Sequence, residues 1–352
     1  MMEQQMAYRG KKPMKAHDKF LACALAYACI SLAPSMAHAT ESGASLYVPG
    51  FKSAVAGITP PPGFYFEADG YSYSGRLSAG KTTQLGGAVL ANVKVQARAG
   101  FLTATWVTPA EILGGNLGFA ATLPLGDPRV SAGALVVAPR FGRVLGGKMR
   151  DSEFLVGDPV LTSFIGWRKG NFNWQIGASA SIPSGSYRDD ALSNLSFNRL
   201  IGDLYVAATW LDPKIGLEVS GSAGYEMNGR NYATQYTSGN AVHADLAVSQ
   251  YLTKDLSIGF LAAHYQQVTR DSGAGNHLGS YRGRVTAIGG TIAYTLNVAG
   301  VPVSTRLKVL REVKVENRPR GAIALLTIAL PLGAPAAPGG APAATPAALH
   351  DD

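Results

Sequence analysis

The stretch from Asn171 to Tyr187 reads NFNWQIGASASIPSGSY and decides the fold class of this 352-residue chain. Taken in steps of two, Phe172, Trp174, Ile176 and the alanines that follow fall on one face, whereas polar and small residues fall on the other. Side chains alternate across a β-strand, so this pattern predicts a strand with one apolar and one hydrated face. The strand ends at Pro183 and leads into a polar loop.

The same alternation recurs along most of the chain and is not interrupted by a helical period. It predicts twelve strands, at 64–73, 90–108, 116–124, 158–168, 171–182, 203–211, 215–226, 241–252, 256–270, 281–298, 301–315 and 320–332. Within the second of these, the apolar face changes sides near Gly100, which predicts a β-bulge there.

Short and long connections alternate between these strands. Tight turns at 169–171, 212–214, 253–255 and 297–301 separate long polar connections such as 126–157, 183–200 and 227–240. A soluble β-sandwich also has one dry and one solvated face, but it has no reason to place every long loop at one end. We therefore expect an all-β fold, a transmembrane antiparallel β-barrel of about 12 strands with short periplasmic turns and long outer loops.

The two termini differ in composition from the barrel. Four lysines, an apolar run and an Ala37-His38-Ala39 site predict a cleaved signal peptide at 1–39; a membrane anchor helix is the alternative. Its removal discards both cysteines and lowers the net charge from +8 to +5, too little to indicate nucleic acid as a partner. Residues 40–62 are an N-terminal lead-in or a lumen segment, 63–332 the barrel, and 333–352 a disordered Pro/Ala-rich tail.

The alternating faces assign side chains to the lipid or to the lumen. Four tryptophans are candidates for an interface girdle, with core packing as the alternative: Trp106, Trp167, Trp174 and Trp210. The candidates that line the lumen are the charged residues of the polar faces: Lys94, Arg98, Asp203, Glu218, His243, Asp245, Arg306 and Lys308. Tyrosine offers a flat apolar face with a polar tip, which suits a hydrophobic solute. Candidates for substrate contact are therefore Tyr225, Tyr232, Tyr236, Tyr265 and Tyr281, although an ordinary aromatic girdle would contain the same residues.

The residues indicate neither catalysis nor a metal or other cofactor. No HExxH, GxSxG, CxxC or phosphate-loop motif occurs after residue 39. His243, Asp245 and Ser249 share one strand face, but they span about 20 Å at 3.4 Å per residue, too far for a relay within that strand. We expect the chain not to be an enzyme, and a membrane-embedded hydrolase is the remote alternative.

A series of loop and strand-end motifs follows one order along the chain. The series is Gly157-Asp158-Pro159, Pro183 to Tyr187, Tyr225 to Asn228, Asn231 to Gly239, His243-Ala244-Asp245, Gln266 to Gly273 and Arg284 to Gly289. In this order the motifs resemble the outer-membrane protein family labelled "meta-pathway of phenol degradation", whose members include sphingosine-induced porin-like proteins. The resemblance covers about residues 63 to 332. The Pro/Ala tail departs from the family pattern, because outer-membrane strands often end at the chain terminus.

The resemblance implies a bacterial outer-membrane channel or transporter for uptake of a small hydrophobic or aromatic compound. The alternative is a non-conducting barrel with a binding or structural role. The expected partners are outer-membrane lipid, the small hydrophobic solute and the barrel-assembly machinery. The residues do not identify the solute.

Overall fold

The computed structural model describes residues 45–77, 82–85, 88–132, 134–137, 149–189, 191–276, 279 and 282–332. All of them belong to one compact unit, Ala37–Asp352. The predicted signal peptide and the Pro/Ala-rich tail lie outside the described residues, as does Tyr281.

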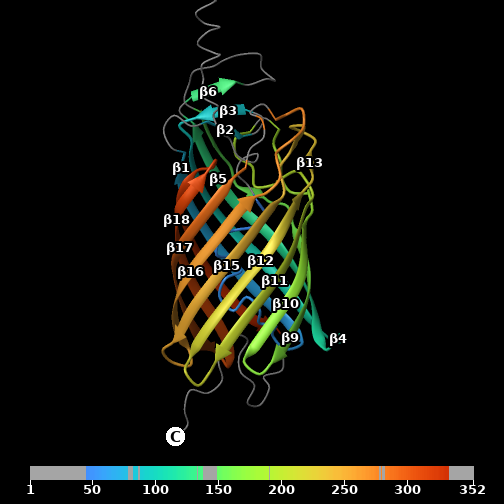
Figure 1. The fold of residues 1–352 in the computed structure, drawn as a ribbon, viewed down its shortest axis with the longest axis vertical. Coiled ribbons are helices and arrows are strands. Elements are labelled where there is room, and N and C mark those ends of the chain that lie inside the picture. Colours follow the sequence, from blue (N-terminus) through green and yellow to red (C-terminus); the bar gives the residue numbers. More distant parts are fainter. Residues whose placement is uncertain are drawn as a thin grey trace, which may run out of the picture. The chain divides into compact units, whose positions relative to one another are not determined.

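Twelve long antiparallel strands form a closed ring (Figure 1). They are β1 (Gly63–Arg76), β4 (Lys94–Ile112), β5 (Gly115–Ala132), β9 (Val160–Lys169), β10 (Phe172–Ser181), β11 (Ile201–Asp212), β12 (Leu217–Asn228), β15 (Ala241–Tyr251), β16 (Leu256–Gln267), β17 (Arg284–Val298), β18 (Val301–Glu316) and β19 (Arg320–Leu332). Strand β4 pairs with β1 on one side and with β5 on the other, and this second pairing closes the ring. The predicted twelve-stranded barrel is confirmed.

Short strands lie at one end of the barrel. Strands β2 (Thr82–Leu85), β3 (Ala88–Ala91) and β6 (Ala134–Val137) form a small sheet, and β13 (Arg230–Asn231) pairs with β14 (Tyr236–Thr237). Strands β7 (Met149–Ser152) and β8 (Leu155–Val156) pair with the C-terminal half of β5, between Leu125 and Ala132. Among the described residues, no helix is long and apolar enough to span a membrane.

The other end of the barrel carries short turns. Leu113 and Gly114 join β4 to β5, and Ala299 and Gly300 join β17 to β18; all four residues have φ between 52° and 84°. Two left-handed residues in a row make the turn that matches the twist of a hairpin. The predicted segregation of short turns from long loops is therefore present in the structure.

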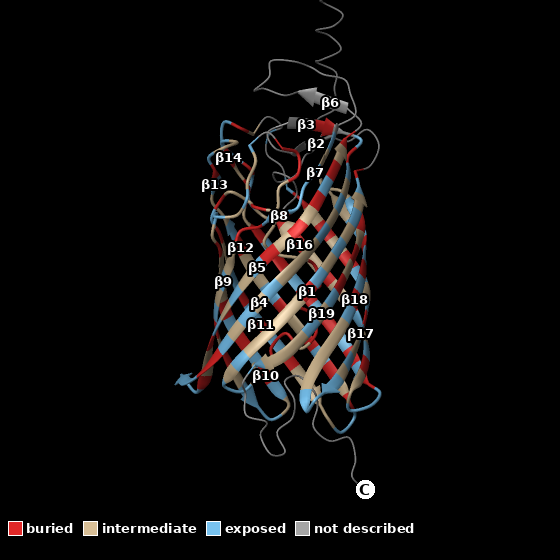
Figure 2. Ribbon diagram, turned by 180° about the vertical axis from the view of Figure 1, so that it is seen from behind, coloured by how far each residue is buried: buried red, intermediate tan, exposed pale blue. Residues whose placement is uncertain are grey.

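Strand β10 has the two faces that its sequence predicts. Phe172 and Ile176 are 56% and 55% exposed, whereas Asn173 and Gln175 are 8% and 7% exposed. The burial pattern alternates in the same way around the barrel, with exposed and buried residues following one another along each strand (Figure 2). Large apolar side chains therefore face outward and polar ones face the lumen, as a membrane barrel requires.

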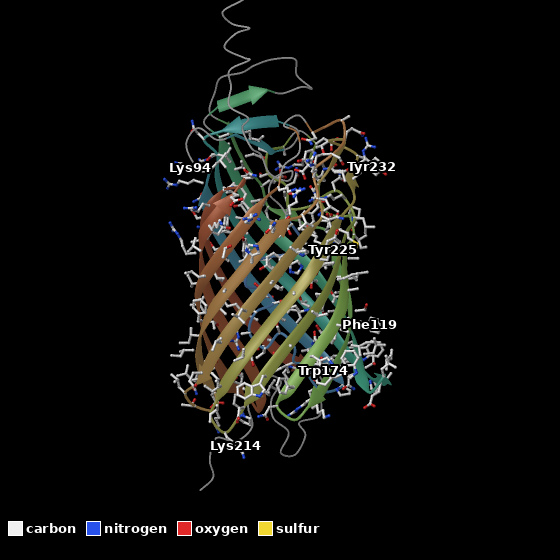
Figure 3. All side chains as sticks on the ribbon, viewed as in Figure 1. Lys94, Phe119, Trp174, Lys214, Tyr225 and Tyr232 are labelled. Atoms are coloured by element: carbon white, nitrogen blue, oxygen red, sulfur yellow. The ribbon has the colours of Figure 1, made fainter. Side chains whose placement is uncertain are left out.

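Aromatic side chains gather on the outer surface near the short turns. Trp106 stacks on Phe64 with ring centroids 5.8 Å apart, and Trp167 stacks on Trp174 at 6.2 Å. Phe119 lies 6.2 Å from Trp106. Phe119 and Trp174 are both seen at this end in Figure 3. This belt is the position that aromatic residues take at a membrane interface.

Strand β4 differs from the sequence prediction in two respects. Its pairing with β1 runs without a shift from Lys94 to Val107, so no bulge occurs at Gly100. The alternate residues Val95, Ala97 and Ala99 line the cavity, which places Lys94 and Arg98 on the outer surface. The predicted lumen position of Lys94 and Arg98 is therefore wrong. The strand extends beyond the apolar band, so its outward face becomes polar while its inward face becomes apolar.

Candidate functional site: a lumen occluded by its own N-terminal segment

Residues 45–62, which we call the lumen segment, are fastened to the inner wall of the barrel. Glu218 of β12 is fully buried, and its Oε1 accepts a hydrogen bond of 2.7 Å from the backbone N–H of Val55. Glu226, on the same strand, accepts from the Ser45 hydroxyl at 2.5 Å. Carboxylates that accept hydrogen bonds make strong contacts, so β12 holds this segment at Ser45 and again at Val55.

Asp245 and Lys308 hold the middle of the lumen segment. Asp245 Oδ1 accepts from the Gly50 N–H at 2.8 Å and from the Tyr47 hydroxyl at 2.8 Å. Lys308 Nζ donates to the carbonyl oxygens of Gly50 and Phe51 at 2.9 and 2.8 Å. Both charged side chains are nearly buried, and their polar atoms replace the hydration that the segment loses inside the barrel.

Gly57 packs directly on the barrel wall. Its N–H donates to Thr209 Oγ1 at 3.0 Å, and a Cβ atom at this position would lie 2.6 Å from the Asn173 carbonyl oxygen and from the Thr209 nitrogen. Backbone atoms of β10 and β11 cannot move aside for a side chain. The close approach therefore requires glycine at position 57.

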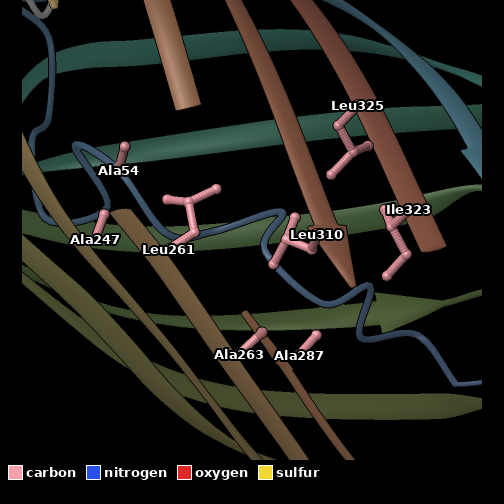
Figure 4. Close-up of a cluster of buried hydrophobic side chains, with 8 residues drawn as sticks. All are labelled: Ala54, Ala247, Leu261, Ala263, Ala287, Leu310, Ile323 and Leu325. Atoms are coloured by element: carbon pink, nitrogen blue, oxygen red, sulfur yellow. The ribbon is translucent and has the colours of Figure 1, made fainter. Parts of the chain in front are cut away.

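Apolar contacts complete the seat of the lumen segment. Ala54 is buried in a cluster with seven residues of the barrel wall: Ala247, Leu261, Ala263, Ala287, Leu310, Ile323 and Leu325. Figure 4 shows Ala54 on the blue segment together with these residues. Three of the seven are alanines, so β15, β16 and β17 leave room for a chain inside the barrel. Phe51 packs against the same cluster and meets Phe101 edge-on at 5.5 Å.

Lys52 is the cation that the lumen segment carries into the barrel. Its Nζ lies 3.2 Å from the centroid of the Tyr205 ring, which is a cation–π contact. Removal from bulk water lowers the pKa of Lys52 to about 7, although the carboxylates of Asp203, Glu67 and Asp245 act in the opposite direction. The ammonium group therefore titrates near neutral pH when the segment is seated.

Tyr47 forms a second polar anchor near the outer end of the segment. Its ring stacks on His243 with centroids 4.3 Å apart, and His243 Nε2 lies 2.8 Å from Asp203 Oδ1. Burial and the neighbouring Asp245 carboxylate raise the pKa of the Tyr47 hydroxyl well above its ordinary value. Tyr47 thus stays neutral and serves as a hydrogen-bond donor.

A cavity of about 720 Å³ remains beside the lumen segment. Its wall on the side of β1, β4, β5 and β9 is mostly apolar, with tyrosines and threonines added. The apolar and tyrosine residues of this wall, which we call the dry wall, are Tyr65, Tyr71, Tyr73, Val95, Ala97, Ala99, Phe101, Ala120, Pro124, Pro128, Val130, Val160 and Phe164. One carboxylate, Glu67, and four threonines lie on the same strands: Thr103, Thr105, Thr122 and Thr162. An apolar cavity with a few polar groups is the usual form of a site for a small hydrophobic ligand.

Of the predicted lumen residues, six lie inside the barrel. Glu218 and Lys308 contact the lumen segment, and Asp203, His243, Asp245 and Arg306 line the cavity. None of the six is on β1, β4, β5 or β9, the strands of the dry wall. Glu218, Asp245 and Lys308 thus fasten the segment, which the sequence did not indicate.

The predicted tyrosine contacts do not form one group. Tyr236 is 2% exposed and donates to Asp271 Oδ2 at 2.7 Å, while Tyr265 is 1% exposed beside Tyr47. Tyr232 is 73% exposed on a loop. Tyr225 lies on the outward face of β12, whereas the next residue, Glu226, faces the lumen and is buried. Tyr281 lies outside the described residues. The tyrosines that do line the cavity include Tyr65, Tyr71 and Tyr73 of β1.

Asp158 organises the outer mouth of the barrel. It is 1% exposed, and it accepts hydrogen bonds from Ser196 Oγ at 2.6 Å, from Phe197 N–H at 2.7 Å and from Gly185 N–H at 2.9 Å. These bonds tie both ends of the connection between β10 and β11 to the start of β9. Leu192, Leu195 and Phe197 of this connection line the cavity from the loop end.

The described residues contain no assembled hydrolase relay. Ser249 Oγ is buried with no hydrogen-bond partner among them, and His243 Nε2 pairs with Asp203 instead. No group of three or more His, Cys, Asp or Glu side chains in the described part of the chain could hold a metal ion.

Comparisons with known proteins find one matching family and a solved channel of the same barrel fold. The family model described as "Putative MetA-pathway of phenol degradation" matches residues 78–328. The COG4313 outer membrane channel from Pseudomonas putida F1 is similar, with a TM-score of 0.61 and 17% identity over 81% of this chain and 100% of that one. No curated protein sequence matches the chain.

Two other solved structures share less with the chain. The translocator domain of autotransporter NalP from Neisseria meningitidis has a TM-score of 0.42 and 12% identity, over 90% of this chain and 96% of that one. A Pseudomonas aeruginosa FadL homologue has a TM-score of 0.40 and 9% identity, over 85% and 99%.

Proposed function

Because the chain belongs to the family described as "Putative MetA-pathway of phenol degradation" and folds as a closed β-barrel, we propose that it is an outer-membrane channel for uptake of a small hydrophobic or aromatic compound. Residues 1–39 would direct export as a cleaved signal peptide, and the barrel-assembly machinery would insert the barrel. The lipid of the outer membrane surrounds the apolar face of the strands.

The contrast between the two sides of the lumen carries this proposal. The lumen segment rests on a charged wall, whereas the cavity beside it faces the dry wall. An apolar wall cannot replace the water that a hydrated ion would have to give up. A hydrophobic solute, in contrast, gains free energy when it leaves water for such a wall. The geometry therefore favours a solute with a flat apolar body and at most one polar group.

The number of hydrogen bonds to the lumen segment favours a second candidate, a non-conducting barrel with a binding or structural role. The bound segment fills part of the lumen and leaves only the cavity beside it open. Conductance in a planar lipid bilayer separates the two candidates. Ion flux that increases when residues 45–57 are deleted supports a channel with a movable segment; absence of flux in both forms supports the non-conducting barrel.

The solute class is tested by uptake into proteoliposomes. Aromatic acids, phenols, fatty acids and sphingoid bases form the panel, with sugars as polar controls. We expect the apolar members to enter faster than sugars of similar size. Equal rates for the two groups would contradict a hydrophobic passage. Hydrolysis of an ester substrate that is lost on Ser249→Ala would instead support the remote hydrolase alternative.

A further inference from the structure

A row of three basic residues crosses the outer surface of the barrel near the long loops. Arg76 of β1 pairs in register with Lys94 of β4 on one side and with Arg320 of β19 on the other. All three residues are exposed. They project outward, because the alternate positions Val95 and Ile323 line the cavity. Figure 3 shows Lys94 at this end of the barrel. We call these three residues the basic row.

The basic row is unfavourable for the isolated protein. Residues directly opposite each other in an antiparallel pair have Cβ atoms about 4.5–5.5 Å apart, and like charges at that distance destabilise the sheet. Within the described part of the chain, no carboxylate forms an ion pair with any of the three. Two other cations at this end do have carboxylate partners, since Arg129 pairs with Asp127, and Glu316 lies 3.6 Å from Arg284. The basic row is therefore available to bind an anion from outside the barrel.

The height of the row on the barrel indicates where that counter-charge lies. Arg76 is twelve residues from Phe64 along β1, and Phe64 pairs in register with Trp106 and Leu332, which are twelve residues from Lys94 and Arg320. Twelve residues in a strand tilted by about 40° rise about 30 Å along the membrane normal. The apolar band of such a barrel is about 25 Å tall. With the aromatic belt at one edge of the membrane, the basic row lies just beyond the other edge.

We propose that the basic row binds the phosphate groups of a phosphorylated glycolipid in the outer leaflet. Arginine presents a planar fork of donors that matches phosphate oxygens, and lysine adds a compact charge. Three cations side by side suit a headgroup with more than one phosphate. The apolar face below the row would contact the acyl chains of the same lipid. This interaction is independent of what the lumen transports.

The test measures lipid binding to the folded full-length chain in neutral detergent. The probe is bisphosphorylated lipid A, and the comparison is the same lipid without its phosphates. Native mass spectrometry gives the retained lipid and its dissociation constant. We expect the unmodified protein to bind the phosphorylated form at least about tenfold more tightly. The triple variant Arg76→Gln/Lys94→Gln/Arg320→Gln should lose this preference.

A matched control carries the same charge change at the opposite end. Arg168, Lys169 and Lys214 are exposed near the short turns, and Figure 3 shows Lys214 there. The triple variant Arg168→Gln/Lys169→Gln/Lys214→Gln should retain the preference within about twofold. Equal binding of both lipids to the unmodified protein would overturn the proposal. An equal loss in both triple variants would overturn it too, because it would indicate attraction by net charge alone.

The single variant Arg76→Gln keeps the proposal testable if the triple variant does not fold. Arg76 lies between Lys94 and Arg320, so this one substitution removes both like-charge repulsions of the row. The thermal midpoint in neutral detergent should therefore rise. In the presence of bisphosphorylated lipid A, the same variant should gain less thermal stability than the unmodified protein. An equal gain for both proteins would contradict binding at the basic row.

Discussion

The hydroxyl of Tyr47 donates a hydrogen bond of 2.8 Å to Asp245 Oδ1, which joins the chain before the first strand to a residue 198 positions later in β15. The same carboxylate oxygen accepts from the Gly50 N–H. Asp245 therefore joins two points of the lumen segment to one strand. Its removal should loosen the segment without breaking any pairing between strands.

Asp245→Ala should increase the open fraction of the channel. A hydrogen bond to a charged group contributes about 1.5–3 kcal/mol, and water in the lumen replaces part of two such bonds. We expect the seated state to lose about 2 kcal/mol, which corresponds to about thirtyfold in the seating equilibrium. Single-channel recording in planar bilayers measures the open fraction. Asp212→Ala, at the end of β11 beside a short turn, is the control and should leave the open fraction unchanged.

Gly57→Val should prevent the lumen segment from seating. The new Cβ would lie 2.6 Å from backbone atoms of the wall, so the segment must move away. Ser53 is fully buried, and the substitution Ser53→Cys introduces the sole thiol after residue 39. The accessibility of this thiol reports whether the lumen segment has left its seat. Its labelling by a polar thiol reagent should accelerate at least tenfold in the Gly57→Val background.

The control for this substitution is Gly70→Ala, where the nearest atom to a new Cβ is the Leu326 carbonyl oxygen at 3.9 Å. It should leave the labelling rate of the thiol at position 53 unchanged. Slow labelling in the Gly57→Val protein would show that the segment tolerates the side chain, and our account of its seat would then be wrong.

Lys52 should make seating of the lumen segment dependent on pH. Its pKa is about 7 when seated and near 10.5 ordinarily, so between these values the released segment binds the additional proton. Lowering the pH from about 9.5 to 7 should therefore favour release, with little further change below 7. The labelling rate at position 53, corrected for the ionisation of the thiol, measures this. Lys52→Met should flatten the profile, and Lys214→Met should not.

The dry wall should control the flux of apolar solutes. Ala97 lines the cavity from β4, and a carboxylate there would need hydration that the wall does not supply. Ala97→Asp should reduce uptake of an aromatic solute about tenfold. Gln96→Asp places the same charge on the outward face of the same strand and serves as the control. A similar reduction in both variants would indicate a general effect of charge on the barrel.

The alternation of side chains predicted the barrel because it is a local property. Phe172 and Ile176 face outward for the same reason that every second residue of a strand shares one face. The rule does not hold at the end of β4, where Lys94 is polar and outward because the strand continues past the apolar band. Apolar side chains mark the lipid face only at the height of the membrane.

The seat of the lumen segment could not be predicted in the same way. Its contacts join Val55 to Glu218 and Gly50 to Lys308, pairs that are far apart in sequence and carry no spacing signal. The tyrosine candidates failed for a related reason. Tyr236 and Tyr265 are close to the loops in sequence, but their neighbours in space bury them within structural hydrogen bonds and stacking contacts.

The central claim is that the cavity beside the lumen segment conducts a hydrophobic solute, and uptake by proteoliposomes tests it most directly. Benzoate and gluconate carry the same charge at pH 8, but only benzoate has an apolar body. Our account predicts that the protein accelerates benzoate uptake at least tenfold over gluconate, and that Ala97→Asp removes the difference. Equal rates for the two anions, or no acceleration over protein-free liposomes, would contradict it.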